Sequence, residues 1–279
     1  MFENEHINKI LPYKIASQKV WESKDRSGIL KLDWNESTVG PSPKVFEKIS
    51  DILKDDFIHL YPNLNNTKLI KYISEYCGVL DTNVQYFAGS DAIHEYIIRC
   101  FLCLNDRVLI VGPTYDNFRL NAESAGSKIY NSNCDSTFIY KEDKIVSDIK
   151  KYKPKMVYLC NPNNPTGYLH SMNFIEELTL SFGDVLFLID EAYFEFSSLT
   201  VSKLAIKNKN IIISRTFSKA FGLANFRVGY VISSNEIIAT INKIRNPKNI
   251  STISQEAAIA ALSDIDYTTK YISEVKDAK

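Results

Sequence analysis

Short apolar runs alternate with stretches of helical pattern along most of the chain. Six runs rich in β-branched residues are expected to be strands, at residues 84–88, 107–111, 156–160, 185–189, 210–214 and 228–232. The runs are mostly continuously apolar, as is typical of strands that helices cover on both faces of a mostly parallel sheet. The pattern therefore predicts a doubly wound α/β domain.

Helices are predicted among these strands at residues 92–104, 115–125, 174–181 and 235–245, and an earlier helix at residues 43–54. Turn and breaker residues punctuate the chain before that helix, so the first 40 residues are expected to form an arm. In a doubly wound sheet, ligands bind beyond the carboxyl ends of the strands. The residues directly after each apolar run are therefore the candidates for a functional site.

A lysine among aromatic and hydroxyl residues follows the run at 210–214. Lys219 stands between Phe217 and Phe221, and Thr216 and Ser218 precede it. Partial desolvation lowers the pKa of an amine and makes it a nucleophile that can form a Schiff base. The two hydroxyl groups are suited to bind phosphate oxygens. A solvated surface lysine is the alternative interpretation of Lys219 taken alone.

A carboxylate follows the run at 185–189. Asp190 stands directly after this apolar run, and a carboxylate at the end of a buried strand is costly unless a cation meets it. The protonated ring nitrogen of a pyridinium cofactor would be such a partner. An acidic cap on the next helix is the alternative interpretation.

Turn-forming and small residues follow three other runs. Residues 161–167, Asn-Pro-Asn-Asn-Pro-Thr-Gly, predict a rigid loop. Gly89, Ser90 and Asp91 would let backbone N–H groups and a helix N-terminus approach an anion. Tyr115 offers an aromatic ring near the same edge of the sheet. A tight turn, an ordinary helix start and a core tyrosine are the respective alternatives.

The charge balance limits the classes of partner. Lysine and arginine together number 33, as do aspartate and glutamate, so the formal net charge is zero. That balance gives no electrostatic reason to expect nucleic acid or an anionic membrane as partner. The first residues lack the pattern of a signal peptide, and no apolar run approaches the ~18 residues of a membrane span. We therefore expect a cytoplasmic protein.

The cysteines and histidines do not form a recognisable metal-binding pattern. Five scattered cysteines argue against a disulfide framework. Cys100 and Cys103 have the spacing of half a zinc site, but they are expected on the buried face of a helix, and no second pair follows. His94 begins a zinc-protease-like sequence, but Ile98 stands where the second histidine is required. No metal site is predicted.

Taken together, these motifs resemble those of class I/II aminotransferases. The resembling stretches are residues 161–167, 190–193 (Asp-Glu-Ala-Tyr) and 216–222 (Thr-Phe-Ser-Lys-Ala-Phe-Gly), with Arg227 behind them, and the histidinol-phosphate aminotransferase branch is the most similar. The resemblance implies the PLP-dependent transferase fold type I. This is an α/β fold with a mostly parallel seven-stranded sheet and helices on both faces. It also implies pyridoxal 5'-phosphate (PLP) as the cofactor.

The resemblance implies a role for each candidate residue. Lys219 would carry PLP and move a proton on the substrate, and Asp190 would pair with the pyridine nitrogen. Asn164 and Tyr193 would hydrogen-bond the ring hydroxyl, and Tyr115 would stack on the ring. The implied phosphate ligands are Ser90, Asp91, Thr216, Ser218 and Arg227.

Two more residues are implied at the borders of the site. Tyr61 would reach the phosphate from the other subunit, because members of the family are homodimers with shared sites. Asn35 would lie on the substrate side.

The resemblance also divides the chain. Residues 1–40 would be an N-terminal arm, 41–246 the PLP-binding large domain and 247–279 the start of a C-terminal small domain. Relatives continue further into that small domain, which supplies the arginine that binds the substrate α-carboxylate. We therefore expect a truncated chain whose small domain is largely absent, and no residue of it can be assigned the arginine role.

The expected activity is an aminotransferase acting between an amino acid or a histidinol-phosphate-like amine and a 2-oxo acid. A PLP-dependent decarboxylase of threonine-phosphate or serine-phosphate type is an alternative, because it would use the same Lys219 and Asp190. A truncated chain that binds PLP without turnover is a second alternative. Release of carbon dioxide identifies the decarboxylase, and an amine-dependent spectral change separates an enzyme from a binding protein.

Overall fold

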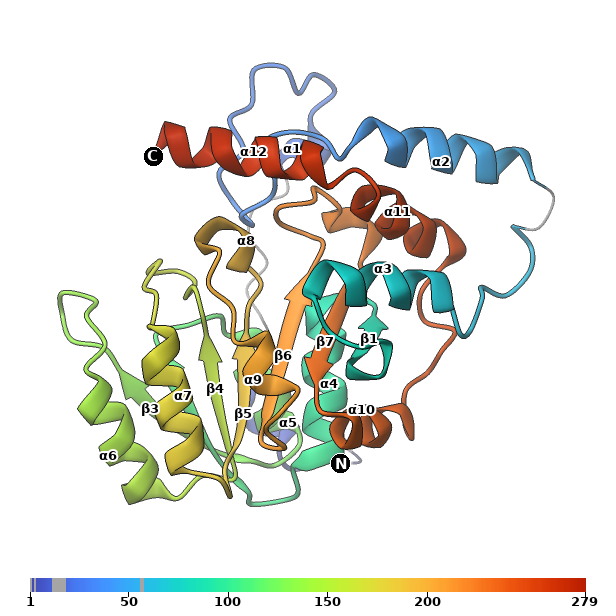
Figure 1. Cartoon of the computed structure of the whole chain (residues 1–279). Helices are drawn as coiled ribbons and strands as arrows, with labels where there is room; N and C mark the ends of the chain where they lie inside the picture. The colour runs from blue at the N-terminus through green and yellow to red at the C-terminus, as the bar shows by residue number, and fades with distance from the viewer. Residues whose placement is uncertain (1, 3, 12–18, 56–57) are drawn as a thin grey trace.

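A seven-stranded sheet forms the centre of the computed structural model, which describes residues 2, 4–11, 19–55 and 58–279 (Figure 1). Its strands are β1 (Val84–Phe87), β2 (Arg107–Gly112), β3 (Lys128–Asn133), β4 (Met156–Cys160), β5 (Leu186–Asp190), β6 (Ile211–Thr216) and β7 (Gly229–Ser233). Their order is β1-β7-β6-β5-β4-β2-β3. Strand β7 is antiparallel to both neighbours and the other pairs are parallel. The predicted mostly parallel α/β sheet is confirmed.

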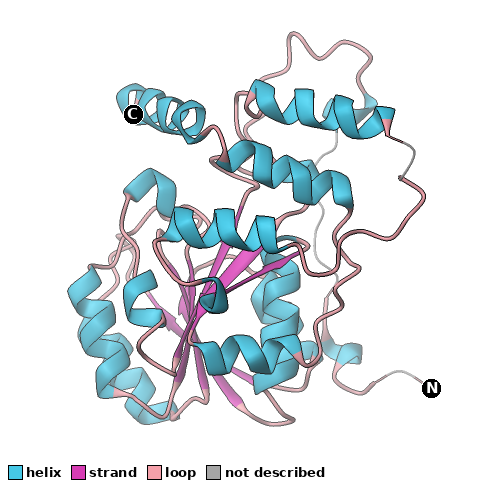
Figure 2. Ribbon diagram, turned by 45° about the vertical axis from the view of Figure 1, so that its right-hand side comes forward, coloured by secondary structure: helices cyan, strands magenta, loops and turns pink. Residues whose placement is uncertain are grey.

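Helices cover both faces of this sheet (Figure 2). One face packs against α4 (Gly89–Phe101), α5 (Asn117–Ser124) and α10 (Asn235–Asn242). The other face packs against α3 (Thr67–Cys77), α6 (Glu142–Tyr152), α7 (Met172–Ser181) and α9 (Ser202–Ala205). Helix α11 (Thr252–Leu262) packs against α3 and extends the same hydrophobic core. The remaining helical elements are η1 (Ile7–Lys9), α1 (Lys19–Glu22), α2 (Pro43–Lys54), η2 (Asp81–Asn83), α8 (Phe194–Ser197), η3 (Ala224–Phe226) and α12 (Ile265–Ala278).

Successive side chains of a strand point to opposite faces of the sheet, so each apolar run contributes to two hydrophobic cores. In β4, Val157 and Leu159 point into the core that includes α6 and α7, whereas Met156 and Tyr158 point into the core that includes α4 and α5. A strand buried on both faces needs apolar side chains at every position. The continuously apolar runs of the sequence are therefore explained by the two helical layers.

The six expected strands all occur, with ends within two residues of the predicted ones. The seventh, β3, was not recognised, because its sequence Lys-Ile-Tyr-Asn-Ser-Asn carries no apolar run. It pairs only with β2 at the edge of the sheet, and its side chains are mostly exposed or half-buried. An edge strand of this kind lacks the hydrophobic signal on which the prediction depended.

The expectation for Cys100 and Cys103 is wrong. Helix α4 begins at Gly89 and ends at Phe101, three residues earlier at each end than predicted. Cys103 consequently lies beyond the helix and is exposed, and Cys100 is only half-buried. The residues that the structure describes contain no cluster of three or more potential metal ligands. Nor do they contain a helix with the length and apolar character needed to cross a bilayer.

A buried ion pair joins the ends of the two central strands β5 and β6. Arg215 precedes the last residue of β6, and Glu191 follows the last residue of β5. The Arg215 Nη2 and Nε atoms donate to Glu191 Oε2 at 2.7 and 2.9 Å, and both side chains are almost inaccessible to solvent. The guanidinium also lies 3.5 Å from the centre of the Phe194 ring. Such a pair fixes the separation and direction of the two strand ends.

We predict that Arg215→Met lowers the free energy of unfolding by about 3 kcal/mol, because it leaves the Glu191 carboxylate buried without its cation. Urea unfolding of the purified chain measures the change. Lys209→Met is the matched control, since Lys209 pairs with Glu236 on the surface and exposed pairs contribute less than about 1 kcal/mol. Equal losses in the two variants would contradict this role of the buried pair.

Candidate active site

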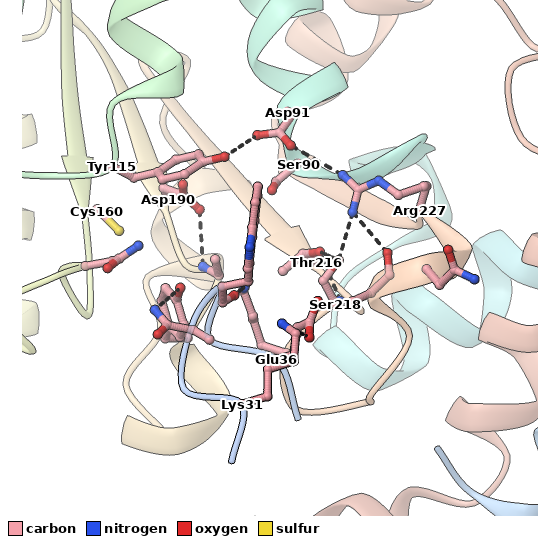
Figure 3. A pocket seen from close by; sticks show the side chains of 18 of the residues that line it. Lys31, Glu36, Ser90, Asp91, Tyr115, Cys160, Asp190, Thr216, Ser218 and Arg227 are labelled. Atoms are coloured by element: carbon pink, nitrogen blue, oxygen red, sulfur yellow. Dashed lines mark hydrogen bonds and ion pairs between the residues drawn. The ribbon is translucent and has the colours of Figure 1, made fainter. Parts of the chain in front are cut away.

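A cavity of about 850 Å³ opens at the carboxyl ends of β4, β5 and β6, beside the first turn of α4 (Figure 3). All of the site residues expected from the sequence line it except Tyr61. The lining residues from that set are Asn35, Ser90, Asp91, Tyr115, Asn164, Asp190, Tyr193, Thr216, Ser218, Lys219 and Arg227. The fold therefore brings together residues that are separated by almost two hundred positions in the chain.

The Lys219 amine is the potential nucleophile of this cavity. Its Nζ atom donates a hydrogen bond of 2.7 Å to the backbone oxygen of Trp34. Burial lowers the pKa of Lys219, and the nearby positive charge of Arg227 lowers it further, while Glu36, Asp91 and Asp190 act against this shift. A buried amine with a lowered pKa is more often unprotonated, which is the form that attacks a carbonyl carbon.

An anion-binding site lies on one side of the cavity and is formed by Gly89, Ser90, Thr216, Ser218 and Arg227 (Figure 3). Helix α4 begins there, and no side chain caps its N-terminal N–H groups. The Thr216 hydroxyl donates to Ser218 Oγ at 2.9 Å, and Arg227 Nη1 lies 3.4 Å from the same oxygen. Hydroxyls, an arginine and an open helix N-terminus together favour a phosphate group.

Two positions beside this anion-binding site require glycine, Gly89 because of its positive φ and Gly229 because of close backbone packing. Gly89 has a φ of +87°, and a Cβ atom there would lie 2.5 Å from Arg227 Nη2. A Cβ on Gly229 would lie 2.8 Å from the carbonyl carbon of Gly89 and 2.9 Å from the nitrogen of Ser90. The start of β7 can therefore approach the first turn of α4 only without a side chain.

The Asp190 carboxylate lies deeper in the cavity and is 3% exposed. The Tyr158 hydroxyl donates to its Oδ2 atom at 2.8 Å, and the Ala192 N–H donates to its Oδ1 atom at 3.2 Å. In the described part of the chain, no lysine or arginine forms an ion pair with it. A buried carboxylate held only by uncharged donors provides a place for a cationic ligand group, such as a pyridinium nitrogen.

Three polar side chains lie around the remaining wall. The Tyr115 hydroxyl donates to Asp91 Oδ1 at 3.1 Å, and Asp91 in turn pairs with Arg227 Nη2 at 3.3 Å. Asn35 Nδ2 donates to the Tyr193 hydroxyl oxygen at 3.1 Å. Burial raises the pKa of Tyr193 to about 12, so its phenol stays protonated at neutral pH and can donate a hydrogen bond.

The residues around the cavity fit PLP. The anion-binding site suits its phosphate, Asp190 suits its pyridine nitrogen, and Lys219 suits covalent attachment of its carbonyl carbon. Each group occupies a different wall of one cavity, which a general anion-binding pocket would not require.

The N-terminal segment contributes residues that sequence analysis did not assign. Lys31, Trp34 and Glu36 line the cavity, and Lys31 pairs with Asp33 at 2.8 Å and also with Glu36. Trp34 and Asn35 have φ angles of 63° and 48°, a conformation that is uncommon for residues other than glycine. The family resemblance assigned only Asn35 of this segment to the site, and the turn residues nearby did not indicate that Lys31, Trp34 and Glu36 would also reach the cavity.

Tyr61 is the expected site residue that lies outside the cavity. Its side chain is 77% exposed, and the Lys248 amine lies 4.6 Å from the centre of its ring. The expectation was that Tyr61 contributes to the site of another subunit, so its exposure in a single chain is compatible with that role. The role itself stays a prediction.

A second buried carboxyl group lies behind the site. Glu195 follows Tyr193 by two residues, is 6% exposed, and has no hydrogen-bond partner for either carboxyl oxygen in the described part of the chain. Burial raises the pKa of Glu195 to about 8, and the positive charge of Arg215 limits the shift. This group is therefore held mostly as the neutral acid at pH 7.

The fold and the cavity define a PLP-dependent enzyme of fold type I. The chain belongs to the family "Aminotransferase class I and II", whose model matches residues 27–278. Members of this family are transaminases that use PLP, and the chain is accordingly an enzyme of this kind acting on small molecules.

Two curated relatives illustrate the similarity. The chain is 45% identical over 280 residues to dihydroxyacetone phosphate transaminase Cj1437c from Campylobacter jejuni, a match that covers 100% of this chain and 76% of the relative. It is 33% identical over 257 residues to a histidinol-phosphate aminotransferase from Caldanaerobacter subterraneus, covering 92% of this chain and 73% of the relative. The chain thus spans about three quarters of the length of these relatives.

Solved structures agree with this family. The histidinol-phosphate aminotransferase from Sinorhizobium meliloti in complex with PLP superimposes with a TM-score of 0.82 at 27% identity, over 88% of this chain and 67% of that chain. An aspartate aminotransferase from Thermus thermophilus in complex with maleate has a TM-score of 0.78 at 18% identity. The second likeness establishes the shared fold.

We predict that Glu195→Gln stabilises the chain at pH 8 by at least about 2 kcal/mol and has little effect near pH 4.5. In the unfolded chain Glu195 loses its proton near its ordinary pKa of 4.5, whereas in the folded chain it keeps the proton up to about pH 8. The contribution of this group to stability is therefore lost as the pH rises from 4.5 to 8, and glutamine removes that loss.

Urea unfolding of wild type and variant across this pH range tests the prediction. Glu177→Gln is the control, because Glu177 is exposed on α7. A stability difference between Glu195→Gln and wild type that does not grow with pH would show that Glu195 ionises normally in the folded chain.

Proposed function

We propose that this cavity transfers an amino group between a phosphorylated amine or an amino acid and a 2-oxo acid, with Lys219 as the residue that binds PLP. One observation carries the proposal: the half-buried Lys219 amine lines the same cavity as the anion-binding site and the buried Asp190 carboxylate. These are the three groups needed to attach PLP, hold its phosphate and stabilise its protonated ring.

Each residue has a defined task in this proposal. When bound, PLP acts as an electron sink for the carbon that bears the substrate amine. Asp190, oriented by Tyr158 and Ala192, keeps a proton on the pyridine nitrogen. Asn164 and Tyr193 would donate hydrogen bonds to the ring hydroxyl oxygen. Tyr115 would stack on the ring.

Lys219 moves the proton in the chemical step. With PLP bound, Lys219 Nζ would accept the proton of the substrate carbon and return it elsewhere, and the lowering of its pKa by burial favours the unprotonated form that this task requires. The anion-binding site, with Thr216, Ser218 and Arg227, keeps the phosphate fixed while these transfers occur. Asn35, which donates to Tyr193, faces the substrate side of the cavity.

The proposed substrate carries a phosphate ester. Both curated relatives are named for phosphorylated substrates, dihydroxyacetone phosphate and histidinol phosphate. L-histidinol phosphate, L-glutamate and dihydroxyacetone phosphate are therefore the compounds to test first. Among the described residues that line the cavity, Arg227 is the only arginine, and it belongs to the anion-binding site. The group that binds a substrate α-carboxylate is not assigned in this proposal.

We also propose that the chain acts as a homodimer in the cytoplasm. Exposed apolar side chains precede Tyr61 in the sequence: Ile58 is 58% exposed and Leu60 is 60% exposed. A second copy covering this segment would bring Tyr61 to an adjacent cavity. Sedimentation of the purified chain as a monomer at assay concentration would oppose the dimer, and cell fractionation tests the location.

The proposed domain division follows the same family pattern. The arm comprises residues 1–40, the large domain residues 41–246, and the start of the small domain residues 247–279. Limited proteolysis tests these boundaries, since exposed linkers are cut first. Protection of both boundaries, near residues 40 and 246, would oppose the division.

The main experiment follows the absorbance of the chain with PLP before and after each amine is added. A spectral change driven by glutamate or histidinol phosphate, with formation of the corresponding oxo or carbonyl product, supports the transaminase. Carbon dioxide release from a phosphorylated amino acid would instead indicate the decarboxylase. PLP binding without any response to amines would contradict turnover by this chain.

We predict that Lys219→Ala abolishes covalent attachment of PLP and lowers the transamination rate by about 10⁴-fold, because both the nucleophile and the base are removed. Borohydride reduction followed by mass spectrometry detects the attachment. The control is Lys207→Ala, an exposed lysine of the same region. PLP trapped on another lysine of the alanine variant would refute the assignment.

Asp190→Ala is expected to retain covalent attachment of PLP at Lys219 but to lower the transamination rate by at least about 10²-fold, because the ring nitrogen loses its anionic partner. Single-turnover kinetics with glutamate measure the rate. Asp184→Ala, an exposed change just before β5, is the control. An unchanged rate would mean that another group pairs with the ring nitrogen.

A further inference from the structure

A fully buried histidine lies directly behind Asp190. His94 is on the inner face of α4 and is inaccessible to solvent. Its ring makes edge contacts with Phe118 and Tyr158, whose ring centroids lie 5.7 and 5.6 Å away, and those two rings stack on each other. This histidine is not among the residues that line the cavity, so it would not contact PLP or substrate itself.

The imidazole points one nitrogen toward the polar groups of the central strands. Nε2 lies 3.1 Å from the Ser214 hydroxyl oxygen on β6 and 3.5 Å from Asp190 Oδ2 on β5. Nδ1 is buried and has no hydrogen-bond partner among the described residues. The Tyr158 hydroxyl, on β4, donates to the same Asp190 oxygen.

These contacts determine which nitrogen carries the proton in the neutral ring. A proton on Nδ1 would be buried without an acceptor, and the bare Nε2 would then face the carboxylate oxygen, which has only lone pairs to offer. A proton on Nε2 can be shared between Ser214 Oγ and Asp190 Oδ2, and the bare Nδ1 costs less than an unpaired N–H. The Nε2–H form is therefore the favoured one.

We propose that His94 is a positioning residue for Asp190. Its Nε2–H and the Tyr158 hydroxyl approach Oδ2 from α4 and β4, while the Ala192 N–H holds Oδ1. Two hydrogen bonds, from Tyr158 and Ala192, and the 3.5 Å contact of His94 Nε2 reach the carboxylate from three separate segments of the chain. Together they restrict its rotation and stabilise its negative charge. This inference rests on the proposed function, in which Asp190 pairs with the pyridine nitrogen of PLP.

A packing role for His94 makes the opposite prediction about substitutions. The ring packs against the stacked aromatic pair Phe118 and Tyr158, so an apolar side chain of similar volume would satisfy packing. Leucine fills such a space but cannot donate a hydrogen bond. Glutamine carries an amide N–H at a distance from Cβ close to that of Nε2, but it packs less well in an apolar site. The two variants therefore separate positioning from packing.

The test compares His94→Leu and His94→Gln with wild type in the full chain. We expect leucine to weaken PLP affinity about tenfold and to slow the glutamate half-reaction by about ten- to a hundredfold, since the polar contact of the imidazole N–H with a charged group is lost. We expect glutamine to remain within about threefold of wild type in both. Absorbance titration with PLP gives the affinity, and thermal unfolding of the PLP-free chain reports folding.

His170→Leu is the matched control. His170 is also buried, also has an unpartnered Nδ1, and packs among aromatic rings away from the cavity. It should change stability but leave PLP affinity as in wild type. Retention of wild-type affinity by His94→Leu together with weakened binding by His94→Gln would overturn the positioning role.

Ser214→Ala provides a second variant that keeps the histidine. Without the Ser214 hydroxyl, Asp190 Oδ2 becomes the remaining acceptor near Nε2, so PLP affinity should be equal to or higher than that of wild type. A tenfold loss in Ser214→Ala would show that the hydroxyl, and not the contact to Asp190, matters. Because Ser214→Ala keeps His94, it tests the contact to Asp190 even if both His94 variants fail to fold.

The outcomes distinguish this inference from the proposed function. If wild type binds PLP on Lys219 and His94→Leu binds it equally well with an equal half-reaction, only the role of His94 fails. If borohydride trapping places PLP on a residue other than Lys219, or the Asp190→Ala variant keeps the wild-type rate, the proposed function itself fails.

Discussion

The site depends on the ion pair between Arg215 and Glu191 on the opposite side of the sheet. Arg215 directly precedes the cavity residue Thr216, and Glu191 directly follows the cavity residue Asp190. The ion pair between Arg215 and Glu191 therefore also fixes the backbone of Thr216 and Asp190. Arg215 also covers the ring of Phe194, which follows the cavity residue Tyr193. Burying two charges costs desolvation free energy, but once the pair has formed, separating the partners would leave a buried charge without its counter-ion. The pair therefore holds its geometry. Three cavity residues are thereby held by contacts that never touch a ligand.

Burial also determines the chemical properties of the side chains that line the cavity. Burial weakens the hold of Lys219 on its proton, raises the pKa of the Tyr193 phenol and leaves the Asp190 carboxylate surrounded by uncharged donors. Each effect costs stability and each prepares a group for one task. The neutral, unpartnered Glu195 behind the site is a further cost of placing polar groups here. Local rules of good packing are expected to fail at functional sites in this way.

The sequence predicted the elements whose signals are local. Apolar runs identified six of the strands, and the rule that ligands bind beyond the strand ends directed attention to Lys219, Asp190 and the loop at residues 161–167. The role of Asn164 within that loop was implied only by the family resemblance. Strand β3 was not recognised because its side chains are mostly polar, and Cys103 was misplaced because α4 ends at Phe101, where the backbone of Leu102 becomes extended.

What escaped prediction in the site depends on contacts between distant segments. Trp34 accepts from Lys219 across 185 positions, and its place in the cavity follows from a backbone conformation that no local pattern reveals. His94 was noted only for a metal motif that it does not complete. Its partners Ser214 and Asp190 belong to two other strands, so its function becomes visible only when the sheet has been assembled.

Two adjacent carboxylates, Glu191 and Asp190, have different kinds of partner. Glu191 and Asp190 are both buried at the end of β5, and strand alternation directs them to opposite faces of the sheet. Glu191 receives a permanent cation, Arg215. Asp190 receives Tyr158, Ala192 and His94 instead, which orient it and stabilise its charge without neutralising it. An arginine paired with Asp190 as well would weaken the attraction of this carboxylate for a cationic ligand group. The absence of a lysine or arginine ion pair among its described contacts therefore supports the proposed pairing of Asp190 with a pyridine nitrogen.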